Sequence, residues 1–185
     1  DGVTEYVKYI NDNSSLTNVL AEIGSEGSVQ AYYTIGADLI SQERDGRTSF
    51  YLYDGHGSVV GLANESGVVT DTYSYDAFGN LISSTGSTEN YYRYCGEQFD
   101  ETTGLYYLRA RYMDTSTGRF ISQDSYAGSI SDPISLHKYL YANANPVMLS
   151  DPSGYIGLLD TVCASAIGNV LFYSASAGLI TFGMG

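Results

Sequence analysis

Short segments in which apolar and polar residues alternate run through the first half of the chain. Val29–Ile35 and Asp38–Arg44 show this alternation, and the Asp45-Gly46 pair that follows favours a two-residue hairpin turn of type I′. Alternation with a period of two is typical of a strand that buries one face. The pattern therefore predicts an all-β chain in which strands a few residues long are joined by minimal turns.

The clearest internal repetition lies in two segments with the pattern Tyr-x-Tyr-Asp-x-x-Gly. Tyr51–Val60 carries it first, and Tyr73–Ile82 carries it again. Such a segment is expected to place both Tyr rings on one side of a strand, to cap the following turn with the Asp side chain and to use Gly as a left-handed residue. Two interpretations stay open: a repeat architecture whose hairpins bury their faces against their neighbours, or an ordinary meander with two similar hairpins.

Aromatic residues dominate the region after Gly86. Tyr91–Tyr94 and Leu105–Asp114 are both predicted to form strands. Half of the chain's basic residues lie within residues 93–119: Arg93, Arg109, Arg111 and Arg119. In a chain with an excess of carboxylates, we expect these arginines to pair with internal Asp or Glu and to stack on Tyr rings. Further along, residues 135–143 predict a turn or two of helix, with Ser135 as its cap.

The composition fits short strands and tight turns, since the chain has 19 Tyr and 21 Gly but no Trp. Its formal net charge of −13 argues against a nucleic-acid backbone or an anionic lipid surface as a partner. The two histidines, His56 and His137, offer little material for a metal site or a catalytic triad, and we expect neither a metal nor a cofactor. Cys95 and Cys163 lack the spacing of a zinc site, and a disulfide between them stays open.

The C-terminal part of the chain differs from the rest. Residues 161–185 contain no charged side chain and are long enough for a membrane span. Gly, Ala, Ser and Asn dilute this segment, so a buried helix, or an apolar chain held inside a larger structure, is an equally good interpretation. The first residues show no signal peptide, and we expect the chain to be a fragment of a longer protein.

Two carboxylates occupy turn-forming settings on either side of residues 125–150. Asp124 follows Gly118–Gln123, and Asp151 opens the turn sequence Asp-Pro-Ser-Gly. Two carboxylates that lie close together do not both ionise easily, so one can act as an acid while the other activates water. Asp before Pro or Gly is also an ordinary turn residue, and a purely structural role for both stays open.

Several motifs occur in a specific order along the chain. They are Tyr51–Val59, Tyr75–Leu81, Thr103–Tyr112, Gly118–Phe120, Asn145-Pro146 and Asp151–Gly154. In this order they closely resemble the Rhs/YD-repeat family, and in particular the Rhs-repeat-associated core. The resemblance covers about residues 51–154. It implies three parts: degenerate YD-type hairpins in residues 1–50, the core in residues 51–155, and the apolar start of a variable C-terminal region in residues 156–185.

The resemblance implies antiparallel hairpins that form a curved or spiralling β-shell, with the core at one end. It also implies secretion or a place at the cell surface, and contacts with the chain's own upstream repeats and downstream segment. In family members that deliver toxins, the shell encloses a downstream effector and releases it by aspartic-type self-cleavage in cis. A non-cleaving structural, filament-forming or cell-surface module is the alternative, and a carbohydrate-binding surface of Tyr rings is a third interpretation.

Carried over residue by residue, the resemblance assigns Asp151 and Asp124 as the catalytic carboxylates and Arg119 as the arginine that keeps one of them ionised. It places the cleavage at the Tyr155–Ile156 bond. The sequence departs from the family's pattern at the first carboxylate, because Asp124 is followed by Ser rather than Pro. Asp132, which does precede a proline, is a rival for that position.

Overall fold

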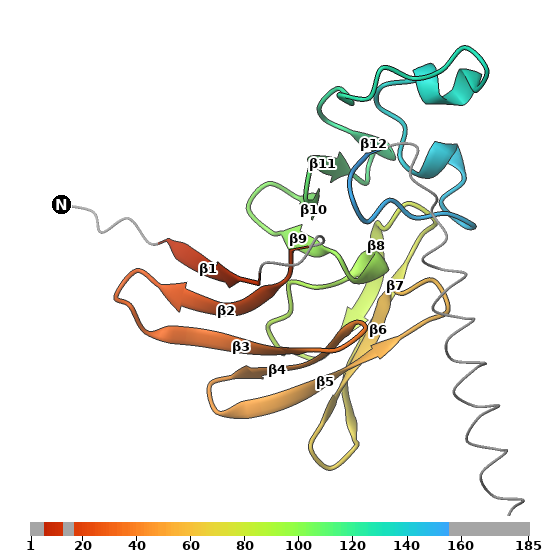
Figure 1. The fold of residues 1–185 in the computed structure, drawn as a ribbon. Coiled ribbons are helices and arrows are strands. Elements are labelled where there is room, and N and C mark those ends of the chain that lie inside the picture. The colour runs from red at the N-terminus through yellow and green to blue at the C-terminus, as the bar shows by residue number, and fades with distance from the viewer. Residues whose placement is uncertain (1–5, 13–16, 156–185) are drawn as a thin grey trace, which may run out of the picture.

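The computed structural model describes residues 6–12 and 17–155, and in this part the chain is all-β (Figure 1). The first sheet is an antiparallel meander of eight strands, in which each strand pairs with the next along the chain. The strands are β1 (Val7–Asn11), β2 (Val19–Gly24), β3 (Val29–Ile35), β4 (Leu39–Arg44), β5 (Arg47–Tyr53), β6 (Val59–Asn64), β7 (Val69–Tyr75) and β8 (Leu81–Thr85). Short strands joined by tight turns are therefore confirmed.

A second antiparallel sheet follows, with the strand order β12-β11-β10-β9. Its strands are β9 (Gln98–Asp100), β10 (Leu105–Leu108), β11 (Arg111–Asp114) and β12 (Arg119–Phe120). The sequence predicts a single strand over residues 105–114, and this prediction is wrong. Arg109 has a positive φ of 59°, and the two-residue turn that it opens divides the segment into β10 and β11.

Two short 3-10 helices, η2 (Pro133–Leu136) and η3 (Ala142–Ala144), lie where the sequence predicts a turn or two of helix. The helical character is confirmed, but the expected cap is wrong. Asp132 holds the N-cap position of η2, because proline is well suited to the first helical position that follows. Ser135 lies inside η2, and its Oγ accepts a hydrogen bond from the backbone N–H of Ser129 at 2.8 Å.

The hairpin turns have the chemistry that the repeat pattern predicts. Asp54 Oδ1 accepts hydrogen bonds from two backbone N–H groups of its turn, both at 2.9 Å, and Asp76 Oδ1 accepts two at 2.8 and 3.0 Å. Gly57 and Gly79 complete these turns with φ values of 81° and 87°, a conformation in which a Cβ is disfavoured. The two repeats therefore end in equivalent turns.

The tyrosines of the repeat line one face of the first sheet, which we call the inner face. The rings of Tyr51 and Tyr53 stack with centroids 6.3 Å apart. Tyr51 donates a hydrogen bond to Gln42 Oε1 at 2.9 Å, and Tyr53 donates one to the Leu39 carbonyl at 2.6 Å. Each buried ring thus keeps a partner for its hydroxyl, which removes the cost of burying it.

Residues 87–97 cross the inner face. Gln42 Nε2 donates to the Glu89 carbonyl at 2.8 Å, and the Val59 N–H donates to the Arg93 carbonyl at 2.9 Å. The sequence predicts a strand over residues 91–94, and this prediction is wrong. The segment makes one isolated bridge and then turns into the 3-10 helix η1 (Tyr94–Gly96), because its aromatic side chains pack on the inner face.

The two sheets share an aromatic core. Its buried members are Tyr94, Tyr106, Leu108, Met113, Phe120, Tyr141 and Ala142. The Tyr94 ring makes edge contacts with Tyr75 of the first sheet and Tyr106 of the second, at centroid distances of 6.0 and 6.2 Å. This core fixes the β10–β11 hairpin, which carries the candidate site, against the meander.

Strand β5 runs across residues 50 and 51, where the resemblance divides the chain, and the sheet is continuous there. The division between degenerate YD-type hairpins in residues 1–50 and the core from residue 51 stays a prediction. Within the described residues, no helix is long and apolar enough to cross a membrane. Residues 161–185 and Cys163, for which the sequence leaves membrane contact and a disulfide open, lie outside the described residues.

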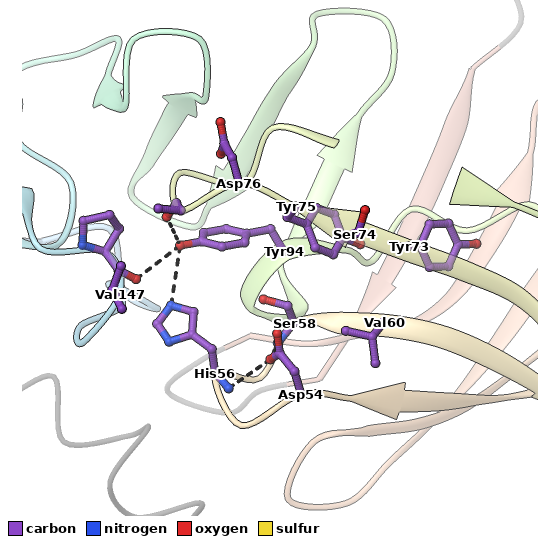
Figure 2. Close-up of a pocket in the computed structure, with 12 residues that line it drawn as sticks. Asp54, His56, Ser58, Val60, Tyr73, Ser74, Tyr75, Asp76, Tyr94 and Val147 are labelled. Carbon is purple, nitrogen blue, oxygen red and sulfur yellow. Dashed lines mark hydrogen bonds between the residues drawn. The ribbon is translucent and has the colours of Figure 1, made fainter. Parts of the chain in front are cut away.

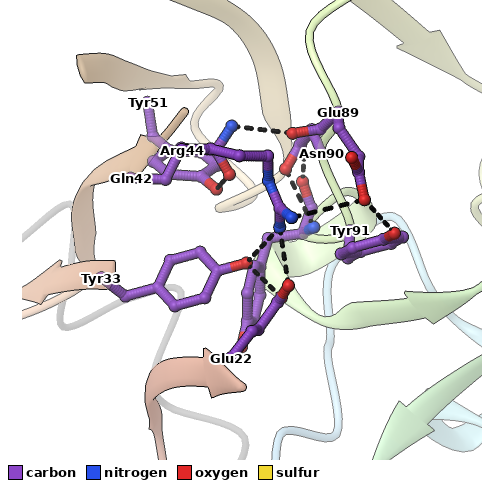
Figure 3. Close-up of polar contacts among 9 residues, drawn as sticks. Glu22, Tyr33, Gln42, Arg44, Tyr51, Glu89, Asn90 and Tyr91 are labelled. Atoms are coloured by element: carbon purple, nitrogen blue, oxygen red, sulfur yellow. Dashed lines mark hydrogen bonds and ion pairs between the residues drawn. The ribbon is translucent and has the colours of Figure 1, made fainter. Parts of the chain in front are cut away.

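A buried ion pair ties the start of the meander to the crossing segment (Figure 3). Arg44 Nη2 lies 2.8 Å from Glu22 Oε2, and the Glu22 side chain is 1% exposed. Tyr33 donates a hydrogen bond to Glu22 Oε1 at 2.6 Å. Arg44 also lies 3.4 Å from Glu89 and 5.4 Å from the centroid of the Tyr91 ring. Arg44 therefore neutralises a carboxylate that would otherwise be buried alone.

Replacing Arg44 by Leu leaves Glu22 without its cation, and we expect the free energy of unfolding in urea to fall by about 3 to 5 kcal/mol. The double variant Glu22→Leu/Arg44→Leu buries no charge and should recover most of this loss. The matched control is Arg47→Leu, the exposed cross-strand neighbour of Arg44, for which we expect a change below about 0.5 kcal/mol. Equal losses for Arg44→Leu and Arg47→Leu would contradict the role of the ion pair.

Candidate functional site

The site is built on Arg111, at the start of β11. Its side chain points inward and is buried, with 4% of the residue exposed. The guanidinium carbon lies 3.6 Å from the centroid of the Phe120 ring, in the geometry of a cation–π contact. The strand alternates buried Arg111, exposed Tyr112 and buried Met113. Strand periodicity therefore turns this arginine toward the protein interior.

Two carboxylates converge on one nitrogen of this arginine. Arg111 Nη2 lies 3.0 Å from Asp124 Oδ2 and 3.5 Å from Asp151 Oδ2. Asp124 is 5% exposed and Asp151 is 1% exposed. The structure thus brings together the two carboxylates that the sequence assigns to catalysis, although they are far apart along the chain.

Local hydrogen bonds fix Asp124. Its backbone N–H donates to the Lys138 carbonyl at 2.9 Å, and Arg111 Nη1 donates to the same carbonyl at 3.2 Å. Asp124 Oδ1 accepts a hydrogen bond from the N–H of Tyr126 at 2.7 Å. This turn forms without the proline of the family's pattern, so the departure at Ser125 leaves the carboxylate in place.

The turn of residues 151–154 fixes Asp151. Asp151 Oδ1 accepts hydrogen bonds from the Tyr155 N–H at 3.1 Å and from Ser153 Oγ at 3.2 Å. Gly154 has a φ of 73°, and a Cβ at this position would lie 2.2 Å from the Leu108 carbonyl oxygen. Only glycine allows so close an approach to the β10–β11 hairpin. Arg111 Nε also donates a hydrogen bond to the Gly154 carbonyl, which locks the turn onto the site.

The charges of this cluster do not balance when both carboxylates are ionised. Burial raises the pKa of Asp151, although hydrogen bonds from Ser153 and the charge of Arg111 oppose the shift. Burial also lowers the pKa of Arg111, against the pull of the two carboxylates. Within the described residues, Asp151 Oδ2 has no hydrogen-bond partner. Asp151 is therefore the member of the pair that is best suited to carry a proton.

Among the described residues, the contact with the two carboxylates is made by Arg111 and not by Arg119. Arg119 is exposed on β12 and pairs through its backbone with Asp114 and Leu140. Successive residues of a strand face opposite sides, so the buried Phe120 turns Arg119 outward, and Arg111 makes the contacts instead. The rival carboxylate Asp132 is exposed at the start of η2 and does not join the cluster.

The expectation that the clustered arginines pair with internal carboxylates is confirmed for three of them. Arg93 pairs with Glu101 at 2.5 Å and Arg109 pairs with Glu97 at 2.7 Å, in addition to the contacts of Arg111. Stacking occurs on phenylalanine rather than on the expected tyrosine, since Arg93 lies over Phe99 as Arg111 lies over Phe120. Sequence reasoning missed Glu97, which no motif marks.

An open pocket of about 370 Å³ lies beside the loop that leads to Asp151 (Figure 2). Tyr94 Oη donates to the Ala77 carbonyl at 2.8 Å and lies 3.5 Å from His56 Nε2. The Asp54 carboxylate lies in the wall of the pocket and accepts hydrogen bonds from backbone N–H groups of its own turn. Pro146, from the start of that loop, completes the wall. The polar groups of this pocket thus serve the turns that surround it.

The described residues contain no group of three or more His, Cys, Asp or Glu side chains arranged to hold a metal ion. Cys95 lies beside the aromatic core, with its Sγ 3.6 Å from Tyr141 Oη. Tyr155 is described and exposed, whereas Ile156, on the other side of the predicted cleavage, lies outside the described residues.

Two relatives align with most of this chain. The tRNA3(Ser)-specific nuclease WapA of Bacillus spizizenii is 43% identical over 152 residues, which cover 80% of this chain and 6% of that protein. Salivary gland surface protein 1 of Aedes aegypti is 32% identical over 164 residues, which cover 81% of this chain and 5% of that protein. The chain therefore corresponds to a small part of each relative.

The crystal structure of TcdB2-TccC3 matches the fold with a TM-score of 0.60 at 22% identity, over 79% of this chain and 8% of that chain. The family model described as Teneurin YD-shell matches residues 8–147, which is most of the sequence. The chain belongs to the Rhs/YD-repeat family, and its antiparallel sheets have the fold of a YD-shell.

Proposed function

We propose that this part of the shell cuts its own chain at the Tyr155–Ile156 bond and so releases a downstream polypeptide that the shell encloses. One observation carries the proposal. Asp151 binds the N–H of Tyr155 through Oδ1, while its buried Oδ2 faces the arginine that holds Asp124. The two carboxyl groups therefore lie close to Tyr155, the residue before the bond to be cut.

The chemistry is hydrolysis by water. Asp124, which lies 3.0 Å from Arg111, takes a proton from water, and the water oxygen attacks the carbonyl carbon of Tyr155. Asp151 gives its proton to the carbonyl oxygen, which produces a tetrahedral intermediate with two hydroxyl groups. As the C–N bond breaks, the departing nitrogen takes the proton held by Asp124, and one hydroxyl group returns a proton to Asp151. The products are a carboxyl group on Tyr155 and an amine on Ile156. Arg111 remains charged throughout.

The same geometry separates the roles of the two acids. Burial raises the pKa of Asp151, which keeps a proton on this carboxyl group at a higher pH than usual. The shorter contact of Arg111 is with Asp124. Two carboxyl groups whose surroundings differ in this way can take the separate roles of acid and base.

With this function, we infer that the protein acts outside the cell or at its surface. The name of one relative, a salivary gland surface protein, supports this location. The partners in this proposal are parts of the same polypeptide: preceding hairpins beside the exposed strand β1 and the segment that follows residue 155. The polypeptide to be released is not specified by the described residues.

A second candidate function is a shell or filament module that never cuts. One observation favours it: Asp124 and Asp151 accept backbone hydrogen bonds within their turns, as Asp54 does in its hairpin. In that case both carboxylates serve only to build turns, and the Arg111 cluster stabilises the end of the shell.

Intact-mass measurement of the purified chain separates the two functions. The parent is expected to give two fragments divided after residue 155, whereas Asp151→Asn and Asp124→Asn should each give one uncut chain. We also expect Arg111→Gln to lower the cleavage rate by about 10²-fold or more, because it removes the charge that positions both carboxylates.

The matched controls are Asp132→Asn and Arg119→Gln, which change exposed side chains outside the cluster. Both should cut at the parent's rate. A parent chain that stays whole, or a cut that survives both Asp124→Asn and Asp151→Asn, would overturn the proposed function and leave the non-cutting module.

The raised pKa of Asp151 also predicts how stability depends on pH. The folded chain holds this proton more tightly than the unfolded chain, so the contribution of Asp151 to stability falls as the pH rises through its folded pKa. In a chain that ends at Tyr155, where no bond is left to cut, Asp151→Asn should raise the melting temperature near neutral pH, because Asp124 still pairs with Arg111. The gain should vanish in acid, where both forms are neutral. A loss of stability at neutral pH would contradict the burial argument.

A further inference from the structure

A second arginine of the same hairpin holds the turn that carries Asp151. Arg109 Nη1 donates to the Pro152 carbonyl at 2.5 Å and to both Glu97 oxygens, at 2.9 and 2.7 Å. The Ala110 N–H adds a hydrogen bond to the Ser153 carbonyl at 3.4 Å. The turn between β10 and β11 therefore grips residues 152 and 153, which directly follow the candidate catalytic acid.

The ionic part of this grip is sheltered from water. The side chains of Arg109 and Glu97 are 25% and 10% exposed. Burial raises the pKa of Glu97 to about 7, although the charge and hydrogen bonds of Arg109 oppose the shift and Asp151 adds to it. When a buried carboxylate has a single cation as its partner, protonation of the carboxylate removes the ion pair.

Accepting the cleavage proposed above, we propose that Glu97 and Arg109 are positioning residues, which together form a clamp that holds the Pro152 carbonyl and thereby places Asp151 for the reaction. The clamp is fully charged when Glu97 is ionised. Protonation of Glu97 removes the anion that orients the Arg109 guanidinium, so the hold on the turn weakens as the pH falls. Neither residue touches the bond to be cut.

The charged and titratable groups that face Glu97 come from several elements. They are Arg109 from the β10–β11 turn, Asp151 from the turn that the clamp holds, Tyr92 from the crossing segment and Tyr141 next to η3. Burial raises the pKa of both tyrosines, so they stay neutral while Glu97 titrates. Glu97 is then the group of this set whose pKa, at about 7, lies in the range where the clamp acts.

Loss of a proton from Glu97 and loss of a proton from Asp151 change the rate of self-cleavage in opposite directions. Ionisation of Glu97 closes the clamp, so the rate should rise with pH through about 7. Loss of the Asp151 proton removes the acid and so lowers the rate. A purely structural Glu97 would change the amount of folded chain without removing one limb of the pH profile of self-cleavage.

The test compares Glu97→Gln with Glu101→Gln, whose side chain is 58% exposed in its pair with Arg93. At about pH 8, Glu97→Gln should cut about tenfold more slowly than the parent, the effect of losing one charge-assisted hydrogen bond. Its profile should also lack the limb near pH 7. Glu101→Gln should keep the parent's rate and profile.

A second measurement does not depend on cleavage. In the uncut Asp124→Asn background, hydrogen exchange of the Tyr155 amide, which donates to Asp151 Oδ1, should become about tenfold faster on adding Glu97→Gln at about pH 8. Parent-like exchange, or a parent-like profile in a chain that does cut, would overturn the clamp. A parent that never cuts, combined with faster exchange in Glu97→Gln, would overturn the proposed function and leave the clamp as a device that orders the turn.

Discussion

The candidate site is held together by the guanidinium of Arg111. It is a buried cation that contacts two buried carboxylates through one nitrogen, the Lys138 and Gly154 carbonyls through the others, and the face of Phe120. Burying two acids around one arginine is unfavourable unless one of them keeps its proton. In the proposed function, the electrostatic imbalance that costs stability also supplies an acid and a base at the Tyr155 peptide.

The fold provides what this arrangement requires. The meander holds its tyrosines on one face, the crossing segment covers that face, and Tyr94 joins both sheets through ring contacts. The β10–β11 hairpin is thereby fixed, and Arg109 and Arg111 each hold a different part of the residue 151–154 turn. A loop that carries a functional side chain gains its precision from such a rigid support.

Much of the fold followed from the sequence because it rests on local rules. The Tyr-x-Tyr-Asp-x-x-Gly repeat predicts both the tyrosine face and the turns at Gly57 and Gly79, which the structure confirms. The turn at Arg109 was missed because a non-glycine residue with positive φ leaves no local signal. Tertiary contacts with Glu97 and Pro152 hold it instead.

The site was predicted in part for a related reason. Asp124 and Asp151 stand in turn sequences that can be read locally, but the choice between Arg119 and Arg111 depends on which strand face is buried. Both strands are short, and the pattern of two to four residues does not fix that face. Glu97 lies in irregular chain, where no periodicity marks burial.

The most direct test of the central claim is to let the parent chain cut itself in water enriched in heavy oxygen and to determine both fragment ends by mass spectrometry. The account predicts a shell fragment that ends at Tyr155 and carries one heavy oxygen in its new carboxyl group, and a partner fragment that begins at Ile156. Heavy oxygen in the Asp124 or Asp151 carboxyl instead would contradict direct attack by water. A fragment that ends at Asp151 would contradict the assigned bond.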